Sequence, residues 1–200
     1  MACLGEEAQI PIIGKNEIVA RAQELLDECW DGEFPVDLEK ICDYLGIAIV
    51  PVEGLKEKFG VDAYVAADFR TMYVDGAGYR NESSRYRFSV AHELGHLVLH
   101  REFFSSRIWD FEEWQGITSG GASGALEFQA NYFAGSLLAP EDELLRVLNV
   151  GFGGSLARNY YRTGREEVEG VLASMQRFFR VSEQVIYRRM RDTIYGWTIN

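Results

Sequence analysis

All three histidines of the chain lie close together, at His92, His96 and His100. The first two frame an H-E-x-x-H motif that also contains Glu93. In a helix, residues four apart lie on the same face, so these two imidazoles can converge on one zinc ion. Glu93 lies one step further round the helix, where its carboxylate can reach a water at the metal and act as a general base. The motif therefore predicts a metal site that activates water.

A catalytic zinc ion usually takes three protein ligands, so the motif needs one more. His100 lies too far along the helix, about 12 Å of rise beyond the first motif histidine, and we expect it to support or pack beside the site. Asp110, Glu112 and Glu113 are candidates in a stretch rich in aromatic residues. We favour Glu127, because it falls in the next helical pattern, where a rigid element can hold it against the first helix. The alternative for Glu127 is a solvated acid near a helix start.

Asn131 lies one helical turn after Glu127. Its amide can hydrogen-bond the outer nitrogen of a ligand histidine and so fix the tautomer of the ring. An ordinary buried amide bonded to the backbone is an equally good interpretation.

Hydrophobic periodicity predicts the elements that must position these residues. Apolar residues at helical spacing predict helices over residues 17–29, 36–45, 85–99, 125–138, 141–148, 166–179 and 182–194. Short apolar runs predict a small antiparallel sheet with strands near residues 47–50, 64–66 and 71–74. Residues 103–123 read as a long ordered loop. The pattern is that of an α+β protein with a mainly helical remainder.

The composition is that of a folded domain: 47% of the 200 residues are hydrophobic and 26% are charged. We expect one domain over residues 1–200, in which about 144–200 form a basic helical extension. No apolar run is long enough to cross a membrane, and the acidic start does not look like a secretory signal. Cys3, Cys29 and Cys42 are odd in number and widely spaced, which favours reduced thiols and a cytoplasmic protein.

The net charge of -11 disfavours general attraction to DNA or to an anionic membrane. The C-terminal quarter is nevertheless basic, and all its basic residues are arginines. Residues 178–182, between two predicted helices, resemble the turn of a DNA-binding helix-turn-helix. We favour the simpler interpretation, in which the two helices complete the core and direct nucleic-acid binding is absent.

Two separated blocks of sequence carry a resemblance to a known family. Residues 87–100, RFSVAHELGHLVLH, and residues 127–134, EFQANYFA, followed by LLAP at 137–140, resemble the ImmA/IrrE metallopeptidases. Weaker similarity at residues 35–39, 45–47, 179–182 and 188–190 extends it over most of the chain. The resemblance implies a zincin-like fold, with zinc bound by His92, His96 and Glu127 and with Glu93 as the catalytic residue.

Members of this family are typically intracellular bacterial or phage proteases that cleave helix-turn-helix repressors of the Xre type. The resemblance therefore implies a cytoplasmic zinc endopeptidase whose protein substrate is such a repressor. The chain departs from the larger members, which carry a further sensory domain after the peptidase. These ligands would also accept manganese. An alternative is a noncatalytic regulator that binds its repressor through contact alone and keeps a structural metal site; the intact motif argues against it.

Two further roles stay open at the level of sequence. A strand such as Thr71 to Val74 could hold an extended substrate by edge pairing. Tyr86, Tyr132 and several arginines are candidates for stabilising the oxyanion, and sequence order does not choose among them.

Overall fold

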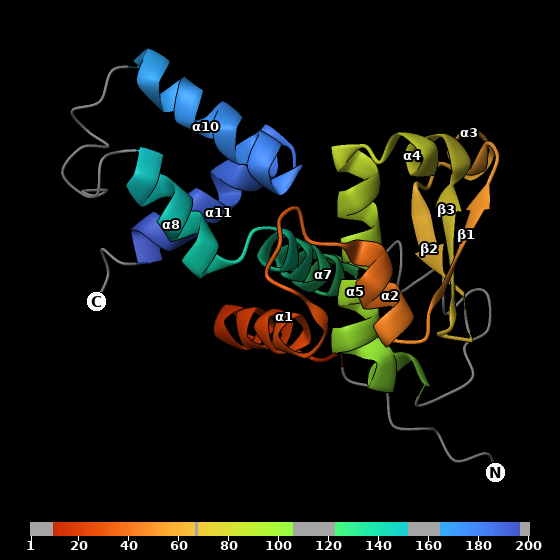
Figure 1. Cartoon of the computed structure of the whole chain (residues 1–200). Helices are drawn as coiled ribbons and strands as arrows, with labels where there is room; N and C mark the ends of the chain where they lie inside the picture. The colour runs from red at the N-terminus through yellow and green to blue at the C-terminus, as the bar shows by residue number, and fades with distance from the viewer. Residues whose placement is uncertain (1–9, 67, 106–122, 152–164, 197–200) are drawn as a thin grey trace, which may run out of the picture.

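A computed structural model describes residues 10–66, 68–105, 123–151 and 165–196. Along the chain these form α1 (Lys15–Cys29), α2 (Leu38–Tyr44), β1 (Ala48–Val52), α3 (Leu55–Phe59), β2 (Ala63–Val65), β3 (Thr71–Asp75), α4 (Gly76–Asn81), α5 (Ser84–Ser105), α7 (Ser123–Leu138), α8 (Glu141–Gly151), α10 (Arg165–Phe179) and α11 (Glu183–Gly196). Helices dominate, and a small sheet lies at one side of α5 (Figure 1). The predicted α+β class is confirmed.

The sheet is mixed, and the prediction of an antiparallel sheet is wrong for one strand. Its order is β1-β3-β2, with β3 in the centre. The strands β2 and β3 are antiparallel, with Tyr64 opposite Tyr73. By contrast, β1 runs parallel to β3, with Val50 opposite Tyr73. The reason is the path of the chain, which leaves β1 through α3 and traverses β2 before it returns as β3 beside β1.

Local hydrogen bonds explain where the helices of this half begin. The side chain of Asp37 accepts from two amides of the first turn of α2, at Glu39 and Lys40, as expected for an N-cap. Asp75 accepts in the same way from Gly78 at the start of α4. The short helices α3 and α4 were not predicted, because five or six residues are too few to show helical periodicity.

The helix α5 is longer than predicted. It starts after Ser83, whose hydroxyl accepts from the amide of Tyr86, and it continues to Ser105. Phe103 and Phe104 are therefore helical, and assigning them to a loop was wrong. Both can extend the helix because no proline or glycine interrupts residues 96–105. The rest of the predicted loop, residues 106–122, lies outside the described residues.

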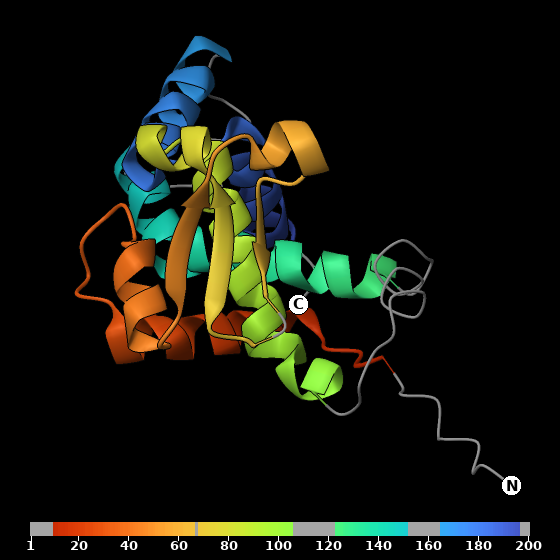
Figure 2. The ribbon, with the colours of Figure 1, turned by 90° about the vertical axis from the view of Figure 1, so that its right-hand side faces the viewer.

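The core lies where α5, α7 and α1 pack together (Figures 1 and 2). α7 is apolar on several faces and buries Phe133, Leu137 and Leu138 completely. α1 covers it through a stripe at helical spacing: Ile18, Ala22, Leu25 and Leu26. The cysteine prediction holds for the described residues, since Cys29 and Cys42 are both free thiols; Cys3 lies outside them.

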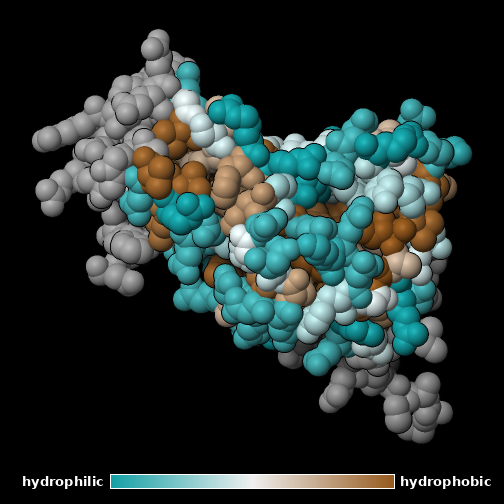
Figure 3. All heavy atoms as spheres, viewed as in Figure 1, coloured by the Kyte–Doolittle hydropathy of each residue, from teal (hydrophilic) through white to brown (hydrophobic). Residues whose placement is uncertain are grey.

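The helices α8, α10 and α11 pack together beyond the end of α7 (Figure 1). Phe179, Ile186 and Met190 of α10 and α11 belong to the same buried cluster as the residues of α1 and α5. This burial supports the interpretation that the Arg-rich end completes the core. In the view of Figure 3, most of the surface is hydrophilic, with hydrophobic side chains gathered over α8 and α10 and over the sheet. Within the described part of the chain, no helix combines the length and apolar character needed to span a bilayer.

Candidate metal centre

Three side chains from two helices converge beside the sheet. His92 and His96 project from neighbouring turns of α5, and their Nε2 atoms lie 3.1 Å apart. Glu127, from α7, places Oε2 at 3.3 Å from Nε2 of His92 and Oε1 at 3.2 Å from Nε2 of His96. One possible ligand atom from each residue lies within 4.8 Å of the other two. Two imidazole nitrogens and a carboxylate oxygen are a donor set that zinc takes in catalytic sites, so these residues fit a divalent cation.

The close approach of α5 and α7 brings Glu127 to the histidines. Gly95, within the motif, faces α7, and a Cβ atom at this position would lie 3.0 Å from both Cα and the carbonyl oxygen of Ala130. Only a glycine fits such a contact without displacing the backbone. The glycine of the motif therefore sets the distance between the helix that carries the histidines and the helix that carries the carboxylate.

The side chains of His92, His96 and Glu127 interact electrostatically. Hydrogen bonds from His92 and His96 hold the pKa of Glu127 well below its usual range. Burial lowers the pKa of His92, but the hydrogen bond to Glu127 and the charge of Glu93 outweigh that effect and raise it. The cluster thus concentrates negative charge beside two imidazoles, which is the electrostatic environment that a cation needs.

Glu93 lies between α5 and the sheet. One of its carboxylate oxygens, Oε2, accepts a hydrogen bond of 3.0 Å from the backbone amide of Val65, in β2. Burial raises the pKa of Glu93. The predicted base is therefore held next to the histidine pair by a contact to the edge of the sheet.

The outer nitrogen of each motif histidine has a partner. Nδ1 of His92 lies 3.2 Å from Oδ1 of Asn131, which is one of the two arrangements that the sequence left open for that amide. Nδ1 of His96 lies 3.1 Å from Nδ1 of His100, which is buried. The expectation that His100 sits beside the site without joining the ligand group is consistent with this geometry.

A chain of contacts behind His100 defines its tautomer. Its Nε2 lies 3.0 Å from Oε1 of Gln129, and Nε2 of Gln129 donates to the carbonyl of Pro11. Burial lowers the pKa of His100 to about 4, so its ring is neutral near neutral pH. Nε2 of His100 then carries the proton, its Nδ1 accepts from Nδ1 of His96, and the inner Nε2 of His96 keeps its lone pair.

Gln129 was missed in the sequence. The available signal was a polar residue within an apolar helical pattern, which by itself does not name a partner. The acids Asp110, Glu112 and Glu113, weighed there as ligands, lie outside the described residues.

The structure shows where the candidates for substrate pairing and for oxyanion stabilisation lie. Tyr86 is buried in the core, where burial raises its pKa, whereas Tyr132 lines a cavity next to Asn131. The strand formed by Thr71 to Val74 is central and has partners on both sides, so its predicted pairing with a substrate is wrong. Among the strands that the structure describes, β2 lies near the site and has a partner on one side only.

Comparison with protein families matches residues 42–191 to a peptidase family described as the IrrE N-terminal-like domain. The chain belongs to this family. The matched range contains the whole of α5 and α7 and therefore every residue of the histidine and carboxylate cluster, while α1 lies before it. Membership confirms the resemblance and implies a metallopeptidase with a metal ion and a protein substrate. No curated protein matched the chain.

Proposed function

We propose that this chain is a zinc-dependent endopeptidase in which His92, His96 and Glu127 hold the metal and Glu93 is the catalytic base. The observation that carries the proposal is the convergence of two Nε2 atoms and a carboxylate from separate helices, with Glu93 one residue from the first histidine. When bound, zinc supplies Lewis acidity, which acidifies water and polarises a peptide carbonyl.

The residues of the chain supply the proton transfers and the orientation. The carboxylate of Glu93 takes the proton of the attacking water and returns it to the nitrogen of the leaving amine. The amide of Val65 occupies only one oxygen of Glu93, which leaves the other for this transfer. Asn131 and His100 hold the two imidazole rings from behind, so the inner nitrogens stay in one orientation.

We propose β2 as the strand that aligns the substrate. Asp62 and Ala66, at either end of it, bond through their backbone to Asp75 and Thr71 of β3. Because backbone groups alternate along a strand, those of Ala63 and Val65 face away from β3. The bond from Val65 to Glu93 agrees with that alternation. An extended peptide that pairs with this edge would lie beside the base and the metal ligands.

We further propose that the substrate is a helix-turn-helix repressor of the Xre type and that the enzyme works in the cytoplasm. Family resemblance supports this assignment. The competing hypothesis, a noncatalytic regulator with a structural metal site, gives no role to the Glu93 carboxylate at the edge of β2.

The test uses Glu93→Gln in the full chain, with Glu102→Gln, an exposed acid further along α5, as the control. Both variants and the wild type are loaded with zinc and incubated with a helix-turn-helix regulator of the Xre type. We expect Glu93→Gln to bind one zinc ion per chain and to cleave at least about 100-fold more slowly, because the base is lost. Chelation should stop the wild type, and added zinc should restore it.

Equal cleavage by Glu93→Gln and the wild type would refute the assigned base. Stable binding of the regulator without cleavage by either protein would favour the noncatalytic alternative.

A further inference from the structure

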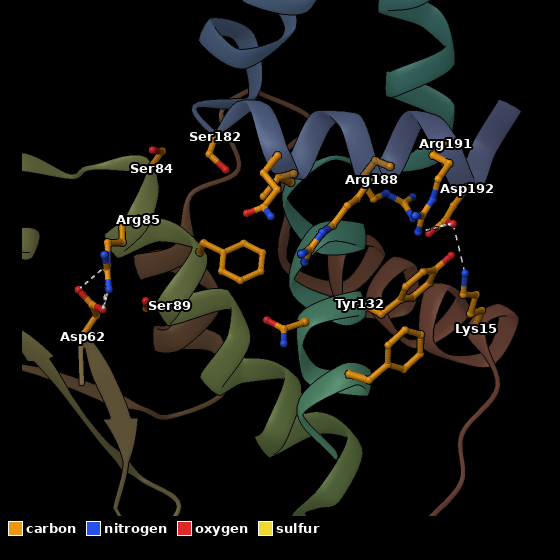
Figure 4. A pocket seen from close by; sticks show the side chains of 17 residues that line it. Lys15, Asp62, Ser84, Arg85, Ser89, Tyr132, Ser182, Arg188, Arg191 and Asp192 are labelled. Atoms are coloured by element: carbon orange, nitrogen blue, oxygen red, sulfur yellow. Dashed lines mark hydrogen bonds and ion pairs between the residues drawn. The ribbon is translucent and has the colours of Figure 1, made fainter. Parts of the chain in front are cut away.

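A cavity of about 790 Å³ opens beside the candidate metal centre, between α5, α7 and α11. Asn131 lines it and also contacts His92. Phe88, one turn before His92 on α5, and Phe128, next to Glu127 on α7, form part of its wall. The cavity therefore lies next to the candidate metal centre and is linked to it through Asn131. Figure 4 shows its polar side chains arriving from both sides.

The acidic side chains of the cavity are already paired. Asp62 accepts from Arg85 at 2.8 Å, and Asp192 accepts from Lys15 at 3.2 Å. Arg188 extends from α11 toward the middle of the cavity (Figure 4). Among the residues that the structure describes, it forms neither an ion pair nor a hydrogen bond. The cavity thus holds a positive charge that no acid of the described chain compensates.

A second guanidinium in the lining is buried and incompletely bonded. Arg189 is only 4% exposed, and its Nε donates to the carbonyl of Ala139 at the end of α7. Its Nη2 atom is buried without a hydrogen-bond partner. An arginine keeps its charge in proteins, and a buried donor that lacks an acceptor is costly. Arg189 also interacts with the hydroxyl of Tyr132. Its unbonded Nη2 is enclosed in the wall, so this guanidinium adds positive charge beside the cavity without opening onto it.

The shape of the cavity leaves room for this side chain. A Cβ atom at Gly135 would lie 3.3 Å from Cδ of Arg189, so glycine lets the arginine lie against α7. The ring of Tyr132 lies 5.9 Å from the guanidinium. Phe88, Phe128 and Val185 make other parts of the wall apolar. An acceptor with an aliphatic stem and an anionic end matches this combination.

We propose that the cavity is a specificity site that binds the carboxylate of a glutamate or aspartate side chain in the peptide substrate through Arg188, with Arg189 adding positive charge from the wall. The inference rests on the proposed peptidase function. Planar guanidinium groups bind carboxylates in paired, charge-assisted hydrogen bonds. Because Asn131 lines the cavity and contacts His92, the acidic residue would lie within a few positions of the cleaved bond.

The test measures binding rather than cleavage. The probes are the blocked peptides acetyl-Ala-Ala-Glu-Ala-Ala-amide and acetyl-Ala-Ala-Gln-Ala-Ala-amide, titrated into zinc-loaded, full-length Glu93→Gln protein and followed by NMR. We expect the glutamate peptide to bind about tenfold more tightly or better, since it gains a hydrogen bond between charged groups. Its addition should shift the side-chain signals of Arg188 and Arg189.

Arg188 is exposed, so Arg188→Gln should leave the fold intact. It should lower the preference for the glutamate peptide over the glutamine peptide at least about threefold. Arg177→Gln, an exposed arginine of α10 outside the cavity, is the matched control and should keep the preference. A variant of Arg189 also removes the bond to Ala139, so Arg188 gives the cleaner result even if Arg189→Gln does not fold.

Equal affinities for the two peptides, or failure of both to bind at millimolar concentration, would overturn the proposal. A third peptide, acetyl-Ala-Ala-Ala-Ala with a free carboxyl terminus, distinguishes the sources of the carboxylate. Tighter binding of that peptide would replace the side-chain assignment by recognition of a chain end. A glutamate preference without any proteolysis by the wild type would preserve this site and refute the proposed function instead.

Discussion

At the scale of single residues, some buried polar groups have hydrogen-bond partners and others have none. Both motif histidines have a partner for the outer nitrogen, at Asn131 and at His100. Tyr86, on the same helix, has none: its hydroxyl is buried without a hydrogen bond and its ring packs edge-on against Tyr79. The first arrangement fixes the orientation of the two rings, whereas the second only fills space.

Replacing Tyr86 by phenylalanine should therefore not destabilise the protein. Removing an unpaired buried hydroxyl relieves a desolvation cost, so we expect the free energy of unfolding of Tyr86→Phe to be unchanged or higher by about 1 kcal/mol. Urea unfolding measures it. Tyr44→Phe is the control, because this exposed hydroxyl donates to Glu28, and its loss should change stability by less than about 0.5 kcal/mol. A loss above about 1 kcal/mol in Tyr86→Phe would mean that the hydroxyl has a partner.

At the scale of elements, the packing of α5 on α7 positions the candidate centre. The contact between Gly95 and Ala130 is the closest constraint that we identify between the two helices. Because Glu127 lies on α7 and the histidines on α5, any separation of the helices also separates the three side chains.

Gly95→Ala should reduce both stability and metal affinity. A methyl group there meets backbone atoms that cannot move aside, so we expect a loss of about 1–3 kcal/mol in unfolding free energy. Zinc affinity, measured by competition with a chelator, should fall as Glu127 moves away. Gly170→Ala, in α10, is the matched control, since its added methyl meets nothing within 4 Å. It should raise stability by up to about 1 kcal/mol. Wild-type zinc affinity in Gly95→Ala would contradict the role of the helix contact.

An ion pair network joins the sheet to α5 and makes stability depend on pH. Burial raises the pKa of Asp62, but hydrogen bonds from Arg85 and Lys56 outweigh it, so the pKa lies below its usual value. The carboxylate therefore stabilises the fold above the pKa of the unfolded chain, and this contribution disappears as the pH falls through the folded value.

Asp62→Asn should be less stable than the wild type near neutral pH by less than about 1 kcal/mol, because the side chains of Lys56 and Arg85 are 41% and 66% exposed and solvent screens their charges. The two proteins should become equally stable as the pH falls through the folded-state pKa of Asp62, which lies below the usual value for aspartate. Urea unfolding across this range tests the effect. A difference between the proteins that does not change with pH would show that Asp62 contributes through packing rather than charge.

The elements themselves were largely predictable, and their pairing was not. Periodicity found the long helices because each buries one stripe of apolar residues, and motif spacing found His92, Glu93 and His96. The helical pattern over residues 125–138 also indicated Glu127 as a ligand candidate and Asn131, one turn later, as its neighbour. The parallel pairing of β1 and the contact of Gln129 with Pro11 depend on how distant segments meet. The composition shows that the C-terminal quarter is basic, but it does not show which of its arginines line a cavity.

At the scale of the whole molecule, the core includes a helix that lies outside the matched family range. This helix is α1, near the N-terminus. α1 precedes residue 42, yet its apolar stripe covers α7, the helix that carries Glu127. Pro11, before α1, also accepts from Gln129 behind the candidate centre. The matched range alone therefore does not contain all the packing that the site depends on.

A chain that begins at Cys42 should lose cooperative unfolding. Its α7 would expose the surface that Ile18, Leu25 and Leu26 cover, and burying three such side chains contributes several kcal/mol, comparable to the total stability of a domain. Thermal melting followed by circular dichroism tests this. Lys15→Ala is the control, because it removes only the ion pair with Asp192 and the contact of the ammonium group with the ring of Tyr132, and it should cost less than about 1 kcal/mol. A sharp melt of the shortened chain at the wild-type temperature would contradict the prediction.

The open edge beside the candidate centre is only three residues long, from Ala63 to Val65, and one of its outward amides is already bonded to Glu93. An incoming polypeptide can pair with so short an edge only where its own amides and carbonyls are free. A helix satisfies those groups internally. If β2 receives the target, a folded helical protein would be cut in its linkers, or in a helix that has first melted, and conditions that loosen the target would govern how fast it is destroyed.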